Sequence, residues 1–255
     1  MKKITVLMVL CACLLFMPML LMAQLNIPTA TPDPEMTAEI TPEATEMVMT
    51  IIIEASEGQA IDPPITIELP PGWISQNATI AIQDITGIQV LPYTLYAGFL
   101  GNTADDGIGY IVLLWGFPSI GFANEFMQAQ DVVISPFMDG LRLLRIALLE
   151  PDCNVGTDVE REFPVGDKIG SGTGFAAINC PNTPDTRGWF VSLYEDGMNF
   201  AFYIYAEPLE KMDGAEDDLQ AILDTVRFDV QGFLERASAE QTPQAEWTAE
   251  ATPTP

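Results

Sequence analysis

Histidine is absent from the 255 residues, and basic residues are scarce. Without histidine the chain cannot form a Ser–His or Cys–His nucleophilic system, and it lacks the usual general base near neutral pH. Only 10 Lys and Arg stand against 36 Asp and Glu, which gives a formal net charge of −26. Such a field repels nucleic acid and anionic lipid. We therefore expect no DNA or RNA binding, no catalytic residue and no cofactor.

The N-terminus carries the features of an export signal. Lys2 and Lys3 precede an almost unbroken apolar run over residues 4–23, which is typical of a signal peptide. We expect cleavage after Ala23, so that the chain acts outside the cytoplasm, either secreted or tethered to the outer face of the membrane. Two alternatives stay open: an uncleaved anchor, because about 20 apolar residues span a bilayer, and lipidation at Cys13. We expect contact with the membrane only through this segment, if it is uncleaved.

Cysteine is rare, and its positions predict a disulfide. Two of the four cysteines lie in the N-terminal apolar run, which leaves Cys153 and Cys180 as an even pair. In an exported protein this favours a disulfide, worth about 3 kcal/mol on the chain-entropy model. Two free buried thiols are the alternative. A zinc site is disfavoured, because two cysteines without histidine form an incomplete ligand set.

Two low-complexity segments flank one predicted domain. Residues 24–46 and 233–255 are rich in Thr, Pro, Glu and Ala, and they hold too few large apolar groups to offset the entropy of ordering. We predict that the first is a disordered spacer and the second a disordered acidic tail. The domain between them, residues 47–232, is long enough to bury one sizeable core.

Strand patterns dominate this domain, and helical patterns are few. A hairpin is predicted where Glu195-Asp196-Gly197 joins two apolar runs, because its glycine tolerates a positive φ. The pattern at 213–216 is a variant of the capping box, and apolar residues at helical spacing follow it. The predicted strands cover residues 47–54, 65–69, 78–82, 88–91, 109–115, 172–178, 189–194 and 198–205, and the predicted helices cover 119–130, 135–149 and 213–226.

Several of these segments resemble the PsbP/Mog1-like domain family. The resemblance lies in residues 65–73 (ITIELPPGW), 174–177 (GFAA), 202–206 (FYIYA) and 221–228 (AILDTVRF). It implies an α+β fold, namely an αβα sandwich with a central antiparallel sheet. It also implies an accessory or adaptor role on larger assemblies, with bound cations in some members. Residues 76–130 depart from the family pattern. The matching motifs are core and turn features and contain no catalytic or ligand-binding residue, so no site residue is carried over.

Acidic clusters are the candidates for cation binding or acid–base chemistry. Residues 105–107 (Asp-Asp-Gly) and 216–218 (Glu-Asp-Asp) are the densest, but neither has the alternating oxygen ligands of a calcium loop. Residues 105–107 are typical of a turn. Residues 216–218 are expected in the first turn of a helix, where acidic side chains interact favourably with the helix dipole. Calcium binding and hydrolysis by two carboxylates are kept as weaker hypotheses.

Two other patterns have a structural interpretation beside a functional one. Ser171 lies in Gly-Ser-Gly-Thr-Gly but misses the nucleophile-elbow register, because Ile169 occupies the first glycine position. A glycine-rich strand is the preferred interpretation. Trp73, Trp115, Tyr203 and Tyr205 would suit a docking surface, yet such aromatic residues more often close a core.

These features together predict a function outside the cytoplasm. We expect an exported, non-catalytic binding or accessory module that docks on an envelope or secreted protein. A carboxylate-based extracytoplasmic hydrolase and a structural envelope protein are the alternatives.

Overall fold

A computed structural model describes residues 51–53, 55–84, 87–101, 106–119 and 136–240. All of these belong to one structural unit, Met47–Pro255. The predicted leader and spacer, the predicted helix at 119–130 apart from Ser119, and residues 241–255 lie outside the described residues.

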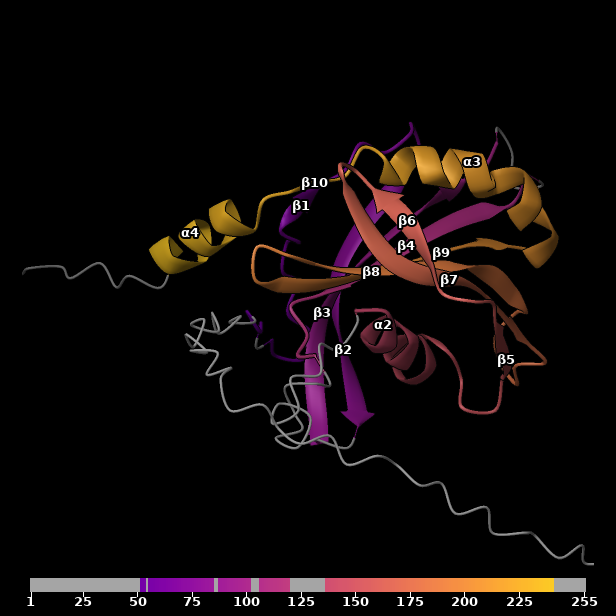
Figure 1. The fold of residues 1–255 in the computed structure, drawn as a ribbon, viewed down its shortest axis with the longest axis horizontal. Coiled ribbons are helices and arrows are strands. Elements are labelled where there is room, and N and C mark those ends of the chain that lie inside the picture. The colour runs from indigo at the N-terminus through magenta and orange to yellow at the C-terminus, as the bar shows by residue number, and fades with distance from the viewer. Residues whose placement is uncertain (1–50, 54, 85–86, 102–105, 120–135, 241–255) are drawn as a thin grey trace, which may run out of the picture. The chain divides into compact units, whose positions relative to one another are not determined.

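An antiparallel sheet organises the domain (Figure 1). Its strands are β2 (Ile74–Asp84), β3 (Gly87–Phe99), β4 (Ile108–Trp115), β5 (Asn154–Thr157), β6 (Arg161–Val165), β7 (Lys168–Ile178), β8 (Thr186–Glu195) and β9 (Met198–Glu207). Their order is β2-β3-β4-β9-β8-β7-β5, and β6 also pairs with β7. A separate two-stranded sheet joins β1 (Ile65–Thr66) to β10 (Arg227–Phe228).

Helices cover both faces of the large sheet (Figure 1). The helix α3 (Met212–Leu223) packs on one face with α4 (Val230–Glu240), and α2 (Pro136–Leu143) packs on the other with the π-helical turn Leu144–Leu148. A short 3₁₀ turn, Leu209–Lys211, precedes α3. The described part of the chain is therefore an α+β fold in which helices flank a mostly antiparallel sheet.

Alternation along β9 divides its side chains between two cores. Phe200, Phe202 and Ile204 face α3, whereas Ala201 and Tyr203 face α2. This division follows from the period of two in a strand. Because both faces are covered, the central strands are buried over nearly their whole length.

The turn between β8 and β9 forms as predicted. Glu195 pairs with Met198, so Asp196 and Gly197 form a two-residue loop. Their φ angles are 45° and 88°, and two positive φ angles are the signature of the turn that matches strand twist. Asp tolerates this region better than most residues, and Gly does so freely.

Three local predictions need correction. Only residues 65–66 of the predicted strand 65–69 form a strand, and within the described part of 47–54 the only strand-like pairing is a bridge from Ile51 to Met198. The capping box at 213–216 does not form. The helix starts at Met212, and its N-cap, Lys211, makes no side-chain capping bond. The Asp213 carboxylate is instead paired with Arg187.

The C-terminal boundary also differs from the prediction. Residues 233–240, assigned to the tail from composition, form most of α4. Phe233 makes an edge-to-face contact with Trp115, with ring centroids 5.3 Å apart, and Leu234 packs against the same core. Two large apolar residues thus suffice to order a segment whose composition is otherwise polar.

Strand β2 lies at one end of the strand order, and the segment 56–62 makes hydrogen bonds to two of its side chains, Thr79 and Asn77. Among the described residues β2 pairs only with β3, over all eleven of its residues. Residues 74–83 contain no charged side chain and no proline, and Ile74 is 60% exposed.

No helix in the part of the chain that the structure describes is long and apolar enough to cross a membrane.

Candidate functional site

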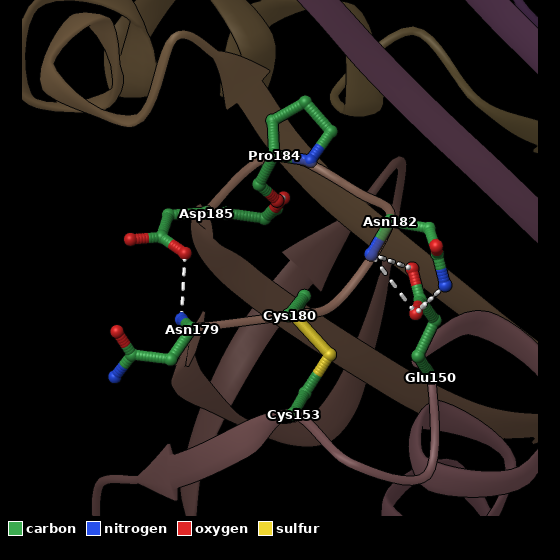
Figure 2. Close-up of a disulfide and its surroundings, with 8 residues drawn as sticks. Glu150, Cys153, Asn179, Cys180, Asn182, Pro184 and Asp185 are labelled. Carbon is green, nitrogen blue, oxygen red and sulfur yellow. Dashed lines mark hydrogen bonds between the residues drawn. A yellow bond between two sulfur atoms is a disulfide. The ribbon is translucent and has the colours of Figure 1, made fainter.

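Cys153 and Cys180 are joined in the structure, with their sulfur atoms 2.08 Å apart and their Cα atoms 4.3 Å apart (Figure 2). The bridge spans 27 residues. It connects the segment that leads into β5 with the loop that follows β7, two strands that are themselves paired over residues 154–157 and 175–178. The disulfide therefore fixes the outer edge of the sheet.

Hydrogen bonds order the loops beside the disulfide (Figure 2). The Glu150 carboxylate accepts bonds from the backbone N–H of Asn182, at 3.2 Å to each oxygen, and from its side-chain amide, at 2.9 Å. The backbone N–H of Asn179 donates to Asp185 at 2.7 Å. The Glu150–Asn182 bonds tie the segment before β5 to the β7–β8 loop a second time, independently of the sulfur atoms, whereas the Asn179–Asp185 bond lies within that loop.

Among the described residues, the acidic side chains of these clusters do not gather into a set of metal ligands. Gly107 has a φ of 94°, as expected for a turn, while Asp105 lies outside the described residues. Residues 216–218 are exposed along α3. No group of three or more Asp, Glu, Cys or His that could hold a metal ion occurs among the residues that the structure describes.

Ser171 lies within β7, opposite Ser192 of β8, and its hydroxyl donates to Glu160. A nucleophile elbow requires a sharp turn from a strand into a helix, and this serine is instead in the middle of a paired strand. The flanking glycines have a packing role. A Cβ on Gly170 would lie 2.4 Å from Val191 Cγ2, and one on Gly172 would lie 1.9 Å from the Phe190 carbonyl oxygen.

Two of the four aromatic residues considered for docking are buried, and the other two, Trp73 and Tyr205, are partly exposed. Trp115 and Tyr203 are 0% exposed, and the Tyr203 hydroxyl donates to the Gly140 carbonyl at 2.9 Å. Tyr205 is partly exposed and stacks on Tyr110, with ring centroids 4.8 Å apart. Trp115 and Tyr203 therefore close the two cores and cannot form a docking surface.

Burial of the tyrosines predicts alkaline unfolding. Loss of solvation raises the pKa of Tyr96, Tyr203 and Tyr205 above the ordinary value near 10. The folded protein then holds protons that the unfolded chain releases, so stability falls as the pH rises above about 10. We expect tyrosinate absorbance at 295 nm from these residues to develop together with the loss of circular dichroism. Ionisation of all six tyrosines near pH 10 in a folded protein would contradict this.

A cleft with a volume of about 470 Å³ opens on the α3 side of the sheet. It lies where β5, β7 and β8 meet the N-terminal turn of α3. Its size is within the range of small-molecule and side-chain pockets, roughly 300–1,000 Å³. Small residues from adjacent strands line it: Gly156, Gly174, Ala176 and Gly188.

Strand register explains why this part of the sheet is hollow. Gly156 is opposite Ala176, which is opposite Arg187, and directly opposed residues point to the same face. Gly174 is opposite Trp189 in the neighbouring row. A Cβ on Gly156 would have no atom within 4 Å. Glycine at position 156 therefore leaves open the space that a larger side chain would fill.

Charged side chains of both signs surround the cleft: Asp158, Arg161, Arg187, Asp213 and Glu216. Arg187 is paired with Asp213. Arg161 lies with its guanidinium carbon 4.7 Å from the centre of the Phe163 ring, a cation–π contact. Asp158 lies over Gly174, a position at which β7 has no side chain. A Cβ on Gly174 would be only 2.7 Å from Asp158 Oδ2.

A buried donor without a partner lies in the same wall. Trp189 lines the cleft and is 4% exposed, and its indole Nε1 is buried without a hydrogen-bond partner among the described residues. Its ring stacks on Phe163 with 9° between the planes. The indole Nε1 of Trp115 is buried without a partner in the same way inside the core, so the missing acceptor at Trp189 follows from burial of the ring and does not itself indicate a ligand.

Sequence reasoning missed this cleft. Its charged residues come from β8, β6, the loop before β6 and α3, so no local motif contains them. Two signals were present in the sequence. Arg161 and Arg187 are two of only 10 basic residues, and the glycines at 156, 174 and 188 fall inside strands, where glycine often marks a close approach of a ligand or of another backbone.

Comparison with known proteins finds no protein-family model that matches this chain and no curated protein with a matching sequence.

Proposed function

We propose that this protein is an exported, non-catalytic binding or accessory module that docks on an extracytoplasmic partner through the cleft at β5, β7, β8 and α3. The observation that carries the proposal is the cleft itself. Its floor contains glycine, charged side chains of both signs border it, and Trp189 forms part of its wall. Such a concave site with a few placed polar groups is how proteins commonly hold a ligand.

The N-terminal sequence and the disulfide support placement outside the cytoplasm. A basic start and an apolar run are what export machinery reads, and Cys153–Cys180 is the kind of bond that persists in oxidising compartments. The helices on both faces of the antiparallel sheet suit the proposed PsbP/Mog1-like fold, whose members act mostly as accessory proteins.

A hydrolase remains the second candidate because three carboxylates border one cleft. Asp158 and Glu216 are exposed, and Asp213 has an 83% exposed side chain that pairs with Arg187. A general acid needs a site that favours its protonated form, which burial provides and exposure does not. This arrangement fits charge recognition better than proton transfer.

A substitution that fills the cleft tests the proposed function. Gly156→Phe places a ring in open space at an edge strand, and Gly214→Phe does the same on α3 outside the cleft. The exported chain and both variants would be immobilised against an extracytoplasmic fraction of the host, and any captured component would be purified and titrated. We expect saturable binding to the unmodified chain and to Gly214→Phe, with a loss of at least about 10-fold in Gly156→Phe.

Two results would overturn the proposal. Capture that never saturates and vanishes with added salt would indicate generic attraction to an acidic protein, as expected of a structural envelope component. Release of a cleaved product, abolished by Asp158→Asn or Glu216→Gln, would establish the hydrolase instead.

A further inference from the structure

The charges that border the cleft are unequally satisfied. Arg187 and Asp213 neutralise each other. Within the part of the chain that the structure describes, no salt bridge involves Asp158, Glu216 or Arg161, and Arg161 rests against the Phe163 ring instead. Two carboxylates and one guanidinium are thus available to bind a ligand in the cleft.

The balance of these charges selects a ligand of mixed sign. A guanidinium pairs best with a carboxylate or phosphate, and carboxylates pair with ammonium or guanidinium groups. The net charge of −26 disfavours the approach of any strongly anionic molecule and favours a cationic one. A phosphate-rich ligand is therefore a poor match, and a molecule with a cationic group and one carboxylate is a good one.

The geometry suits a compact ligand of this kind. The cleft volume of about 470 Å³ exceeds that of a single amino acid but is well below that of a folded partner surface. The wall beneath is apolar, because Trp189 is 4% exposed and its indole Nε1 is buried, so the charged side chains at the rim are left to hold the polar groups of a ligand.

We propose that the cleft binds a basic amino acid with a free carboxylate, with the carboxylate on Arg161 and the cationic side chain between Asp158 and Glu216. This inference rests on the proposed function and names the ligand chemistry of the same site. The ligand has two sources that share this chemistry: the free amino acid, and a lysine or arginine at the C-terminus of a partner peptide.

Calorimetric titration of the full exported chain at fixed ionic strength tests the proposal. The probes are L-arginine, agmatine (which lacks the carboxylate), a short peptide ending in arginine, and the same peptide with an amidated C-terminus. We expect saturable binding of L-arginine or of the free-acid peptide, and binding at least about 10-fold weaker for agmatine and the amidated peptide. Binding of the free amino acid alone identifies a small-molecule site, and binding of the peptide alone identifies a peptide C-terminus as the partner element.

Matched variants distinguish binding at the cleft from attraction by the net charge of the protein. Asp158→Asn, Glu216→Gln and Arg161→Gln should each weaken binding by about 10-fold, the usual size of a lost charge-assisted bond. Asp217→Asn removes the same charge from an exposed position of α3 that does not line the cleft, and it should change the affinity less than 2-fold. Equal effects of Asp217→Asn and Asp158→Asn would overturn the proposal, as would no saturable binding of any probe.

Failure of this inference is distinguishable from failure of the proposed function. If Gly156→Phe abolishes binding of a captured partner while neither L-arginine nor the free-acid peptide binds, the cleft is a docking site and the ligand chemistry is wrong. If the captured partner is also indifferent to Gly156→Phe, both proposals fall.

Discussion

Trp115→Ala should reduce the free energy of unfolding by about 3–5 kcal/mol, the cost of truncating a large buried aromatic residue. Trp115 ends β4, is 0% exposed, and lies under Phe233 of α4. Removing the indole leaves a cavity beneath that helix and takes away its main aromatic contact. Because small domains are stable by only about 5–15 kcal/mol, this loss would shift the urea midpoint strongly.

Two further variants define the cause of that loss. The indole Nε1 of Trp115 has no hydrogen-bond partner among the described residues, so Trp115→Phe should cost much less than Trp115→Ala, about 1.5 kcal/mol or below. Ile74→Ala, at a position 60% exposed, should stay within about 0.5 kcal/mol. Equal destabilisation by Trp115→Phe and Trp115→Ala would show that a polar contact, and not packing, sets the cost.

Removal of the disulfide is expected to have the second large effect, a loss of about 2–5 kcal/mol in Cys153→Ala/Cys180→Ala. The bridge closes a span of 27 residues, so its absence restores conformational freedom to the unfolded chain. Equilibrium unfolding of the double variant, compared with the oxidised parent, measures this directly. Treatment of the parent with a reductant should lower its midpoint to a similar value.

Folding of the reduced domain is still expected, because Glu150 holds Asn182 through bonds that do not need the sulfur atoms. A matched variant, Glu150→Gln, should cost only about 1 kcal/mol, as these groups are exposed to water. If the double cysteine variant were as stable as the parent, the disulfide would be a by-product of proximity and the loop-entropy argument would not apply here.

The β8–β9 hairpin was predictable because all its determinants are local. Two apolar runs flank Asp196-Gly197, and the positive φ at both positions is what those residue types permit. Alternation along β9 also depends only on the local sequence, and it places Phe202 and Tyr203 on opposite faces whatever covers them. The α+β class was implied by the resemblance to the PsbP/Mog1-like family, and the described residues have that class.

Features that depend on distant partners were not predictable in this way. Asp213 has the spacing of a capping residue, but Arg187 lies close enough in the fold to take its carboxylate. Phe233 lies in a segment of mostly polar residues. Its contact with Trp115, which is distant in the sequence, helps to explain why α4 is ordered. The cleft is an extreme case, because its side chains come from separate elements and meet only through strand register.

The β2 edge has a consequence for how these molecules behave in a crowded solution. Natural edge strands usually protect themselves locally, with lysine, proline or a bulge, and residues 74–83 have neither lysine nor proline. Here the segment 56–62 covers part of the strand through hydrogen bonds to Asn77 and Thr79. A second protection is long-range, because copies with a net charge of −26 repel one another before their edges come within pairing distance. Such protection works like colloidal stabilisation and depends on the surroundings. Acid, or salt that shortens the screening length, weakens it without altering the fold.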